Sequence, residues 1–124
     1  MIGYVTLGSN DIPRAAGFYD GLLGVVGAKR LMDMGSFIAW GTAMGSPMLA
    51  VIKPFNGNAA SVGNGVMVAL QMSSKEQVNA VHAKALALGG ADEGAVGPRG
   101  DGFYAGYFRD LDGNKLNAFC MTGG

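Results

Sequence analysis

The chain has 124 residues, 49% of them hydrophobic, and nine Lys and Arg residues balance nine Asp and Glu residues. This length suits one compact domain whose core needs no disulfide, and the single Cys cannot form an internal bridge. The longest basic run is the pair Lys29-Arg30, so no phosphate-tracking surface is visible and nucleic acid is not an expected partner. No apolar run approaches the roughly 20 residues that span a bilayer. We therefore expect no membrane partner and a soluble, cytoplasmic protein.

The first half of the chain alternates between strand and helix patterns. Val5 and Leu7 alternate with Tyr4 and Thr6, which predicts a strand over residues 2–8. Apolar residues then recur at three- and four-residue spacing up to Val26, which predicts a helix that Asn10 or Asp11 caps and Gly27 ends. Three short strands follow, at residues 28–34, 37–42 and 47–53, separated by Gly- and Ser-containing turns.

The second half repeats this order after a connector over residues 54–64 that is rich in Gly, Asn, Ala and Ser. A strand is predicted over residues 66–72. Ser73 or Ser74 then caps a helix, with Glu76 or Gln77 completing a capping box, and Gly89-Gly90 ends the helix. The remaining segments are a Gly-rich loop over residues 94–102 and strands over residues 103–109 and 115–121.

Laying the halves on each other with an offset of 63 pairs Tyr4 with Met67 and Leu7 with Leu70. This internal repeat of pattern predicts an α+β fold of two βαβββ modules. Residues 1–124 then form a single domain, with modules at 1–53 and 65–121 and a connector at 54–64.

Strand alternation indicates which side chains face away from the helices. The helices are expected to cover the apolar face of each strand, which leaves a second, more mixed face. No helix remains for that face, so we expect a curved mixed sheet around a cavity. The residues assigned to this ligand-binding cavity are Tyr4, Thr6, Trp40, Met48, Ala50, Met67, Ala69, Asn117 and Phe119; Ile52, Tyr104 and Tyr107 are further candidates.

Two short motifs resemble those of a known family. Residues 18–24, Phe-Tyr-Asp-Gly-Leu-Leu-Gly, lie in the first helix, and residues 109–116, Arg-Asp-Leu-Asp-Gly-Asn-Lys-Leu, precede the last strand. Together with the duplicated βαβββ pattern, they resemble the glyoxalase, bleomycin-resistance and extradiol dioxygenase superfamily, also called the vicinal oxygen chelate family. Leu111 stands where the family usually has Pro. Both motifs have structural explanations, as helix core residues and as a turn in which Gly113 takes a positive φ.

The resemblance also implies where metal-dependent members hold their ion. Those members use His, Glu or Gln at cavity-facing positions that map onto Tyr4, Ala50, Met67 and Asn117 of this chain. Ala and Met offer nothing to a hard or borderline divalent ion, and Tyr and Asn are weak neutral ligands. We therefore expect no metal site and no cofactor.

Other catalytic groups are sparse. The only His, His82, falls in the middle of the second helix and is expected on its sheet-facing side, away from the cavity. Cys120 alternates onto the apolar side of its strand and is expected to be a buried, inert thiol. The Gly-Xaa-Ser-Xaa-Gly nucleophile motif is absent, and Gly63-Asn64-Gly65 precedes a strand rather than following one, unlike a dinucleotide-binding loop.

These observations favour metal-independent binding or sequestration of a small apolar or aromatic molecule, as the bleomycin-resistance branch implies. One alternative, which rests on the resemblance alone, is a glyoxalase-like enzyme (lyase, isomerase or dioxygenase) with an atypical active site. A third hypothesis is a homodimeric scaffold without ligand, and the resemblance implies a homodimer in any case. The cavity residues also have a plain structural explanation, in which they only fill the interior of the sheet.

Overall fold

The computed structural model describes residues 1–122, which form eight strands and two helices. The elements of the first half are β1 (Tyr4–Gly8), α1 (Ile12–Gly24), β2 (Lys29–Asp33), β3 (Phe37–Gly41) and β4 (Met48–Ile52). Those of the second half are β5 (Val68–Gln71), α2 (Lys75–Ala87), β6 (Ala91–Pro98), β7 (Phe103–Arg109) and β8 (Lys115–Met121). Within the described residues, neither helix is long and apolar enough to cross a membrane.

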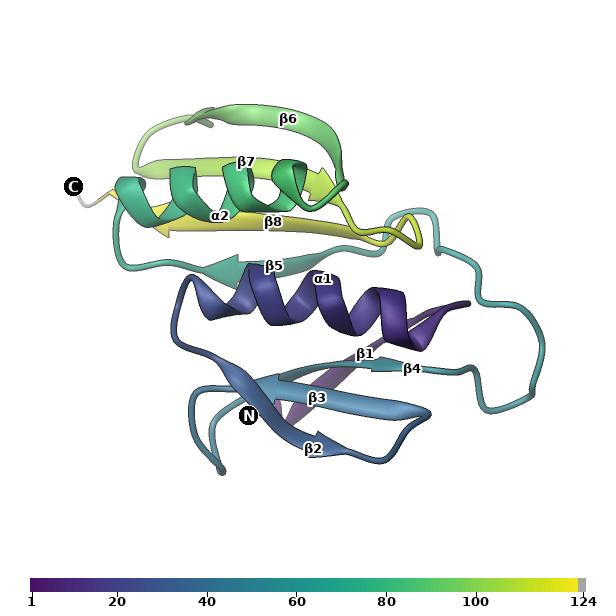
Figure 1. The fold of residues 1–124 in the computed structure, drawn as a ribbon. Helices are drawn as coiled ribbons and strands as arrows, with labels where there is room; N and C mark the ends of the chain where they lie inside the picture. The colour runs from purple at the N-terminus through teal and green to yellow at the C-terminus, as the bar shows by residue number, and fades with distance from the viewer. Residues whose placement is uncertain (123–124) are drawn as a thin grey trace.

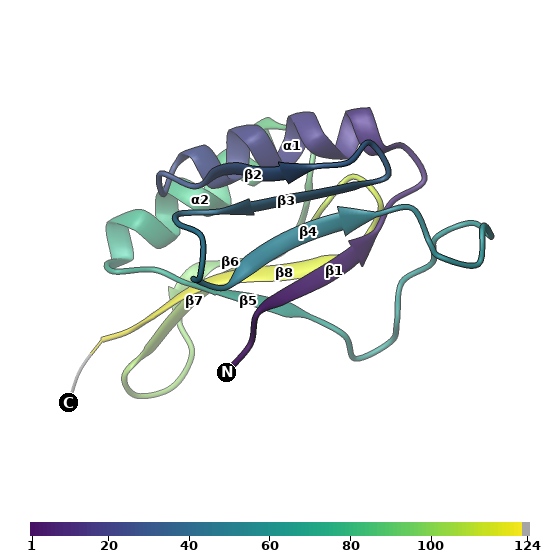
Figure 2. The same cartoon turned by 90° about the horizontal axis from the view of Figure 1, so that it is seen from below.

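The strands form two four-stranded mixed sheets, one from each half of the chain. The first has the order β1-β4-β3-β2 and the second β5-β8-β7-β6, and in each the first pair is parallel and the others are antiparallel. Helix α1 packs on β2, β3 and β4, helix α2 packs on β6, β7 and β8, and the helices contact each other. Figures 1 and 2 show both helices on one side of the strands, with no helix on the other side. We call this other side the uncovered face.

The two helices confirm the repeat in detail. An offset of 63 carries α1 onto α2 from first to last residue. Asp11 caps α1 by accepting a hydrogen bond from the Arg14 backbone N–H at 3.1 Å. Ser74 caps α2 by accepting one from the Gln77 backbone N–H at 3.1 Å, and the Gln77 side chain accepts one from the Ser73 N–H at 2.8 Å. The cap expected at Ser74 is therefore present, but the Gln77 side chain returns to Ser73 and not to Ser74, so the reciprocal capping box is shifted by one residue.

The hydrophobic core lies between the helices and the strands. Alternate residues of the strands face the helices: Leu7, Leu116, Ala118 and Cys120 are buried there, and Val5, Val68 and Leu70 pack against them. They meet the inward stripe of each helix, including Tyr19 and Leu22 of α1 and Val78 and Val81 of α2. Burial of these stripes drives the pairing of helix and sheet. The strand alternation predicted for β1, β5 and β8 is thereby confirmed.

Strand β6 corrects the sequence prediction, which placed a Gly-rich loop over residues 94–102. The chain instead continues as a strand to Pro98 and pairs antiparallel with β7. Its register shifts between Asp92 and Gly94 and again between Gly94 and Gly97. These irregularities interrupt the two-residue alternation that identifies a strand in a sequence. Residues 94–98 therefore could not be recognised as part of a strand.

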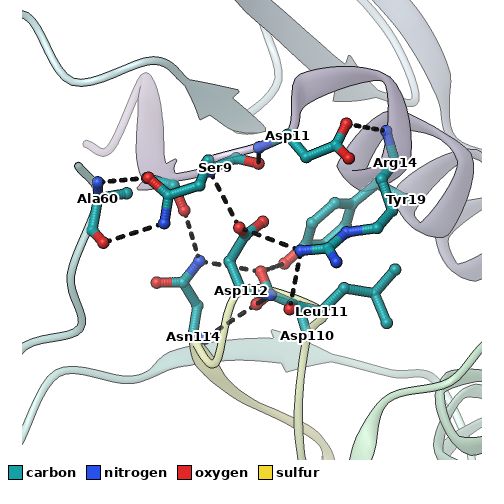
Figure 3. Close-up of polar contacts among 11 residues, drawn as sticks. Ser9, Asp11, Arg14, Tyr19, Ala60, Asp110, Leu111, Asp112 and Asn114 are labelled. Atoms are coloured by element: carbon teal, nitrogen blue, oxygen red, sulfur yellow. Dashed lines mark hydrogen bonds and ion pairs between the residues drawn. The ribbon is translucent and has the colours of Figure 1, made fainter. Parts of the chain in front are cut away.

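The two motifs form one polar network that joins the halves (Figure 3). The Tyr19 hydroxyl of α1 donates a 2.6 Å hydrogen bond to the buried carboxylate of Asp110, in the turn before β8. Asp110 also accepts bonds from the Asp112 and Asn114 backbone N–H groups, both at 2.9 Å, while the Asn114 amide donates to the Gly8 carbonyl at 2.9 Å. Gly113 takes φ +88° in this turn, as expected. Both motifs therefore hold the modules together.

Candidate functional site

The uncovered face is built by the strand alternation opposite to that of the core. The register places Tyr4 beside Met48 and Thr6 beside Ala50 on the first sheet, and Ala69 beside Asn117 on the second. The faces expected for these residues, for Phe119 and for Ile52 are therefore those found. Ala50 and Asn117 are nonetheless almost completely buried by their neighbours on this face.

Aromatic pairs lie on this face of both sheets. The Tyr4 ring, 56% exposed, meets the Phe37 ring edge to face with centroids 5.8 Å apart. On the second sheet, the Phe103 and Phe119 rings stack with centroids 5.4 Å apart. Met67 and Met121 add further exposed apolar surface. Large apolar side chains gathered on one face are typical of a binding surface.

An apolar hollow of about 660 Å³ lies where the edge strands of the two sheets approach each other. Four of the nine predicted cavity residues line it, namely Trp40, Met48, Met67 and Ala69. The other lining residues come from β1, β4, β5 and the loops around them, with Leu23 of α1 among them. Tyr4, Thr6, Ala50, Asn117 and Phe119 lie outside this hollow.

Trp40 reaches the hollow from a side that the sequence prediction did not assign to it. It pairs in register with Leu49 on the helix-covered face, its ring packs on Tyr19 with centroids 5.5 Å apart, and it is 1% exposed. Its indole N–H donates to the Asp20 carboxylate of α1 at 2.8 Å. The face expected for Trp40 is therefore corrected. β3 is apolar on both faces, so its alternation did not indicate which residues point inward.

A second hollow, of about 590 Å³, adjoins the first at Met67, which lines both. One wall is the loop before β5, and the other is formed by Tyr107, Arg109 and Lys115 on the uncovered face of β7 and β8. We call it the basic hollow. Its lining is completed by Val62, Gly63, Asn64, Gly65 and Val66.

The sequence left the faces of the β7 aromatic and basic residues open, and the structure settles them. Tyr104 faces the helices, where its hydroxyl donates to the Asn79 side chain at 2.7 Å, whereas Tyr107 and Arg109 face the other way. Lys115 was not predicted as a site residue. The signal was available, because Lys115, Asn117 and Phe119 alternate on one strand and therefore share a face.

The four positions that the family resemblance linked to a metal ion do not fit one. They hold one phenol, one methyl group, one thioether and one amide, and Ala50 and Asn117 are buried. Within residues 1–122, no group of three or more His, Cys, Asp or Glu side chains lies close enough to hold a metal ion. Divalent ions prefer imidazole and carboxylate ligands that converge from several strands. We derive no chemistry through a metal.

The only His and the only Cys of the chain lie on the helix-covered side. His82 is 7% exposed, and its Nε2 lies 3.2 Å from both an Asp92 carboxylate oxygen and the Tyr107 carbonyl oxygen. Cys120 is buried in the core, as expected. At the basic hollow, the Arg109 guanidinium donates a hydrogen bond to the Glu93 carboxylate, and this hydrogen bond lowers the pKa of Glu93. Glu93 is therefore an ionised partner of Arg109, not a free base.

The chain matches a known protein family over most of its length. The model of the Glyoxalase/Bleomycin resistance protein/Dioxygenase superfamily matches residues 1–118. The chain belongs to this superfamily. A glyoxalase/bleomycin resistance protein from Albidiferax ferrireducens T118 is 34% identical, with a TM-score of 0.89 over 97% of this chain and 98% of that one. A search of curated proteins found no match.

Less similar solved structures share the fold. Lactoylglutathione lyase from Agrobacterium tumefaciens is 22% identical with a TM-score of 0.69, and the match covers 97% of this chain and 92% of that one. TioX from Micromonospora sp. ML1 is 17% identical with a TM-score of 0.71, and covers 98% of each chain. At these identities the likeness concerns the α+β fold with its curved, unclosed sheet.

Proposed function

We propose that this chain binds a small apolar or aromatic molecule on its uncovered face and does so without a metal ion. The observation that carries the proposal is the apolar hollow of about 660 Å³, whose lining includes Met48, Met67 and Ala69 of the uncovered face. Its size is within the range of sites for small molecules, and its lining is mostly apolar. The donor set at the family's metal positions supports the metal-independent form of the proposal.

The enzyme hypothesis is a weaker alternative. Lactoylglutathione lyase is among the structures that share this fold, but fold alone does not carry an activity from one protein to another. The three groups best suited to acid or base chemistry are occupied structurally: His82 and Asp92 face each other, and Glu93 pairs with Arg109. The scaffold hypothesis and the homodimer also remain predictions, which sedimentation equilibrium and ligand screening address.

Fluorescence titration with N-phenyl-1-naphthylamine, a neutral aromatic probe whose emission rises in apolar surroundings, tests the binding proposal. Met67→Asp places a charge in the wall that both hollows share, and should weaken binding about tenfold or more, since burying a Met side chain contributes roughly 1.5–3 kcal/mol. Met34→Asp is the matched control, because Met34 is exposed in the turn after β2 and lines neither hollow.

The outcomes separate the hypotheses. Saturable binding that Met67→Asp weakens and Met34→Asp preserves supports the proposed site. Binding that both variants leave unchanged would place the ligand elsewhere, and an absence of saturable binding would favour the enzyme or scaffold hypotheses. Far-UV circular dichroism of each variant shows whether it is folded.

A further inference from the structure

The basic hollow differs from the rest of the uncovered face in its charge. Tyr107, Arg109 and Lys115 form one wall, and the Val62–Met67 loop forms the other. The Arg99 guanidinium also lies near this wall, 5.4 Å from the centre of the Tyr107 ring. Three cations, Arg99, Arg109 and Lys115, therefore lie around this wall, whereas the uncovered face of β1 and β4 in the first sheet carries none.

The charges of this cluster are only partly balanced. Arg109 is neutralised by Glu93 and also donates to the Gly113 carbonyl at 2.9 Å. Arg99 donates to the backbone carbonyls of Ala95, Gly97 and Pro98, which fixes the guanidinium without cancelling its charge. Across residues 1–122, neither Arg99 nor Lys115 has a carboxylate within 4.0 Å.

Lys115 is the cation best placed to meet a ligand. It lines the basic hollow directly, and its ammonium group lies 5.5 Å from the centre of the Tyr107 ring. The side chain is half-buried, so the ammonium is held against this ring. The Glu93 carboxylate, whose pKa the Lys115 charge also lowers, is held by Arg109. Among the described residues, Lys115 therefore has no carboxylate within 4.0 Å, and a half-buried cation of this kind is a suitable site for an anionic group.

A buried hydrogen-bond acceptor lies beside this cation. In the described part of the chain, two buried side-chain oxygens lack a hydrogen-bond partner, Asp112 Oδ2 and Asn117 Oδ1, and only Asn117 is on the uncovered face. Asn117 is two residues from Lys115 on the same face of β8 and pairs in register with Tyr107. A buried acceptor without a donor is destabilising, but Asn117 lines neither hollow, so we assign it no contact with a ligand.

We propose that the basic hollow binds the anionic group of an aromatic ligand, a carboxylate or sulfonate, with Lys115 as its main electrostatic partner. This inference rests on the proposed function, in which the apolar part of the ligand occupies the adjoining apolar hollow. Met67 lies at the junction of the two hollows. The ligand class is therefore an amphipathic aromatic anion, not a neutral hydrocarbon.

Two matched probes test the charge directly. 8-Anilinonaphthalene-1-sulfonate and N-phenyl-1-naphthylamine share the same rings and the same bridging N–H, and differ by the sulfonate. The wild-type protein should bind the sulfonate on the order of tenfold more tightly, the scale expected of one charge-assisted contact. Lys115→Met removes the charge and keeps most of the apolar stem, and should remove this preference by weakening binding of the sulfonate.

Lys84→Met is the control variant, because Lys84 is exposed on α2 and lines neither hollow. It should retain the preference for the sulfonate. A measurement on the wild-type protein alone adds an independent check: raising sodium chloride from about 0.05 to 0.5 M should weaken binding of the sulfonate and not that of the neutral probe, since salt screens the charge.

The possible results distinguish the inference from the function on which it rests. Equal wild-type affinity for the two probes, or a preference that survives Lys115→Met, overturns the anion site while the apolar site stands. Sulfonate binding that does not respond to salt also counts against the anion site. Failure of both probes to bind overturns the proposed function, and the inference falls with it.

Discussion

The Tyr19 hydroxyl and the Asp110 carboxylate, 2.6 Å apart, join the helix of the first module to the last turn of the second. Tyr19 is fully buried, and burial, followed by the charge of Asp110, holds its pKa well above the ordinary value. The hydroxyl is therefore a permanent donor over the whole accessible pH range. Asp110 in turn orders the backbone of the turn that carries Gly113 and Asn114.

Tyr19→Phe should lower the free energy of unfolding by about 1–3 kcal/mol, because the buried Asp110 carboxylate loses one of its donors. The matched control is Tyr104→Phe, which removes a hydroxyl whose partner, Asn79, is exposed. That variant should change the stability by about 1 kcal/mol or less. Urea denaturation measures both, and equal losses in the two variants would contradict the role given to the Tyr19 hydroxyl.

Two glycines should respond oppositely to substitution by Ala. A Cβ at Gly90 would lie 2.7 Å from the Arg109 carbonyl oxygen and 2.8 Å from the Ala85 carbonyl oxygen, so the backbone at the end of α2 would have to move. Gly90→Ala should therefore destabilise the fold by about 1–3 kcal/mol. Gly17 lies inside α1, and a Cβ added there would meet no atom within 4 Å beyond its own helix backbone and chain neighbours. Gly17→Ala should stabilise the fold by about 0.5–1 kcal/mol.

Thermal and urea unfolding of the two glycine variants can be compared directly with the wild type. A stabilising Gly90→Ala substitution would contradict the close packing of Gly90 against the Arg109 carbonyl oxygen. A destabilising Gly17→Ala substitution would show that another element or a partner covers this part of α1.

Most of the order of elements and the faces of β1, β5 and β8 could be predicted, because the local signals agreed with one another. The cap at Ser74 stands directly before the apolar stripe of α2, and Leu7 and Leu116 belong to strands with one clearly apolar face. Where the local signal is ambiguous, the prediction was wrong. Trp40 lies in a strand that is apolar on both faces, and residues 94–98 form a strand broken by bulges at Gly94 and Gly97.

The candidate site was predicted only in part, for a related reason. Alternation places Asn117 and Phe119 on the uncovered face, but it does not say how the two modules approach each other. Met67 lines both hollows, and the first of them is shared between the two sheets, whose relative placement is not encoded in any local pattern. Lys115 lines a hollow only because the loop before β5 forms the opposite wall. This loop has no periodic pattern from which its path could be inferred.

The pH dependence of stability should report on Asp20. Hydrogen bonds from the Arg30 guanidinium lower the pKa of this carboxyl, with the Trp40 indole N–H contributing less. The unfolded chain therefore binds more protons than the folded chain between the two pKa values, and stability rises with pH in that window. The contribution is present above the unfolded-state pKa of about 3.9 and is lost as pH falls through the lower folded-state value.

Asp20→Asn should thus be less stable than the wild type near pH 7, by about 1 kcal/mol or less because the ion pair is solvent-exposed. The difference should shrink as the pH falls below about 3.9 and through the lower folded-state pKa, because the wild-type carboxyl then becomes protonated. Asp101→Asn, in the exposed turn between β6 and β7, is the control and should follow the wild type throughout this titration. A difference for Asp20→Asn that persists in acid would assign the effect to packing on Trp40.

Metal content is the last prediction, and it follows from the side chains at Tyr4, Ala50, Met67 and Asn117. Protein purified without a metal-affinity tag should contain no stoichiometric transition metal by inductively coupled plasma mass spectrometry, because these positions offer only weak, neutral ligands. Treatment with EDTA should then change neither the melting temperature nor the affinity for N-phenyl-1-naphthylamine, since no metal contributes to folding or to the site. One equivalent of a tightly held metal, together with a melting temperature that falls on chelation, would instead support the enzyme hypothesis and require ligands beyond these four residues.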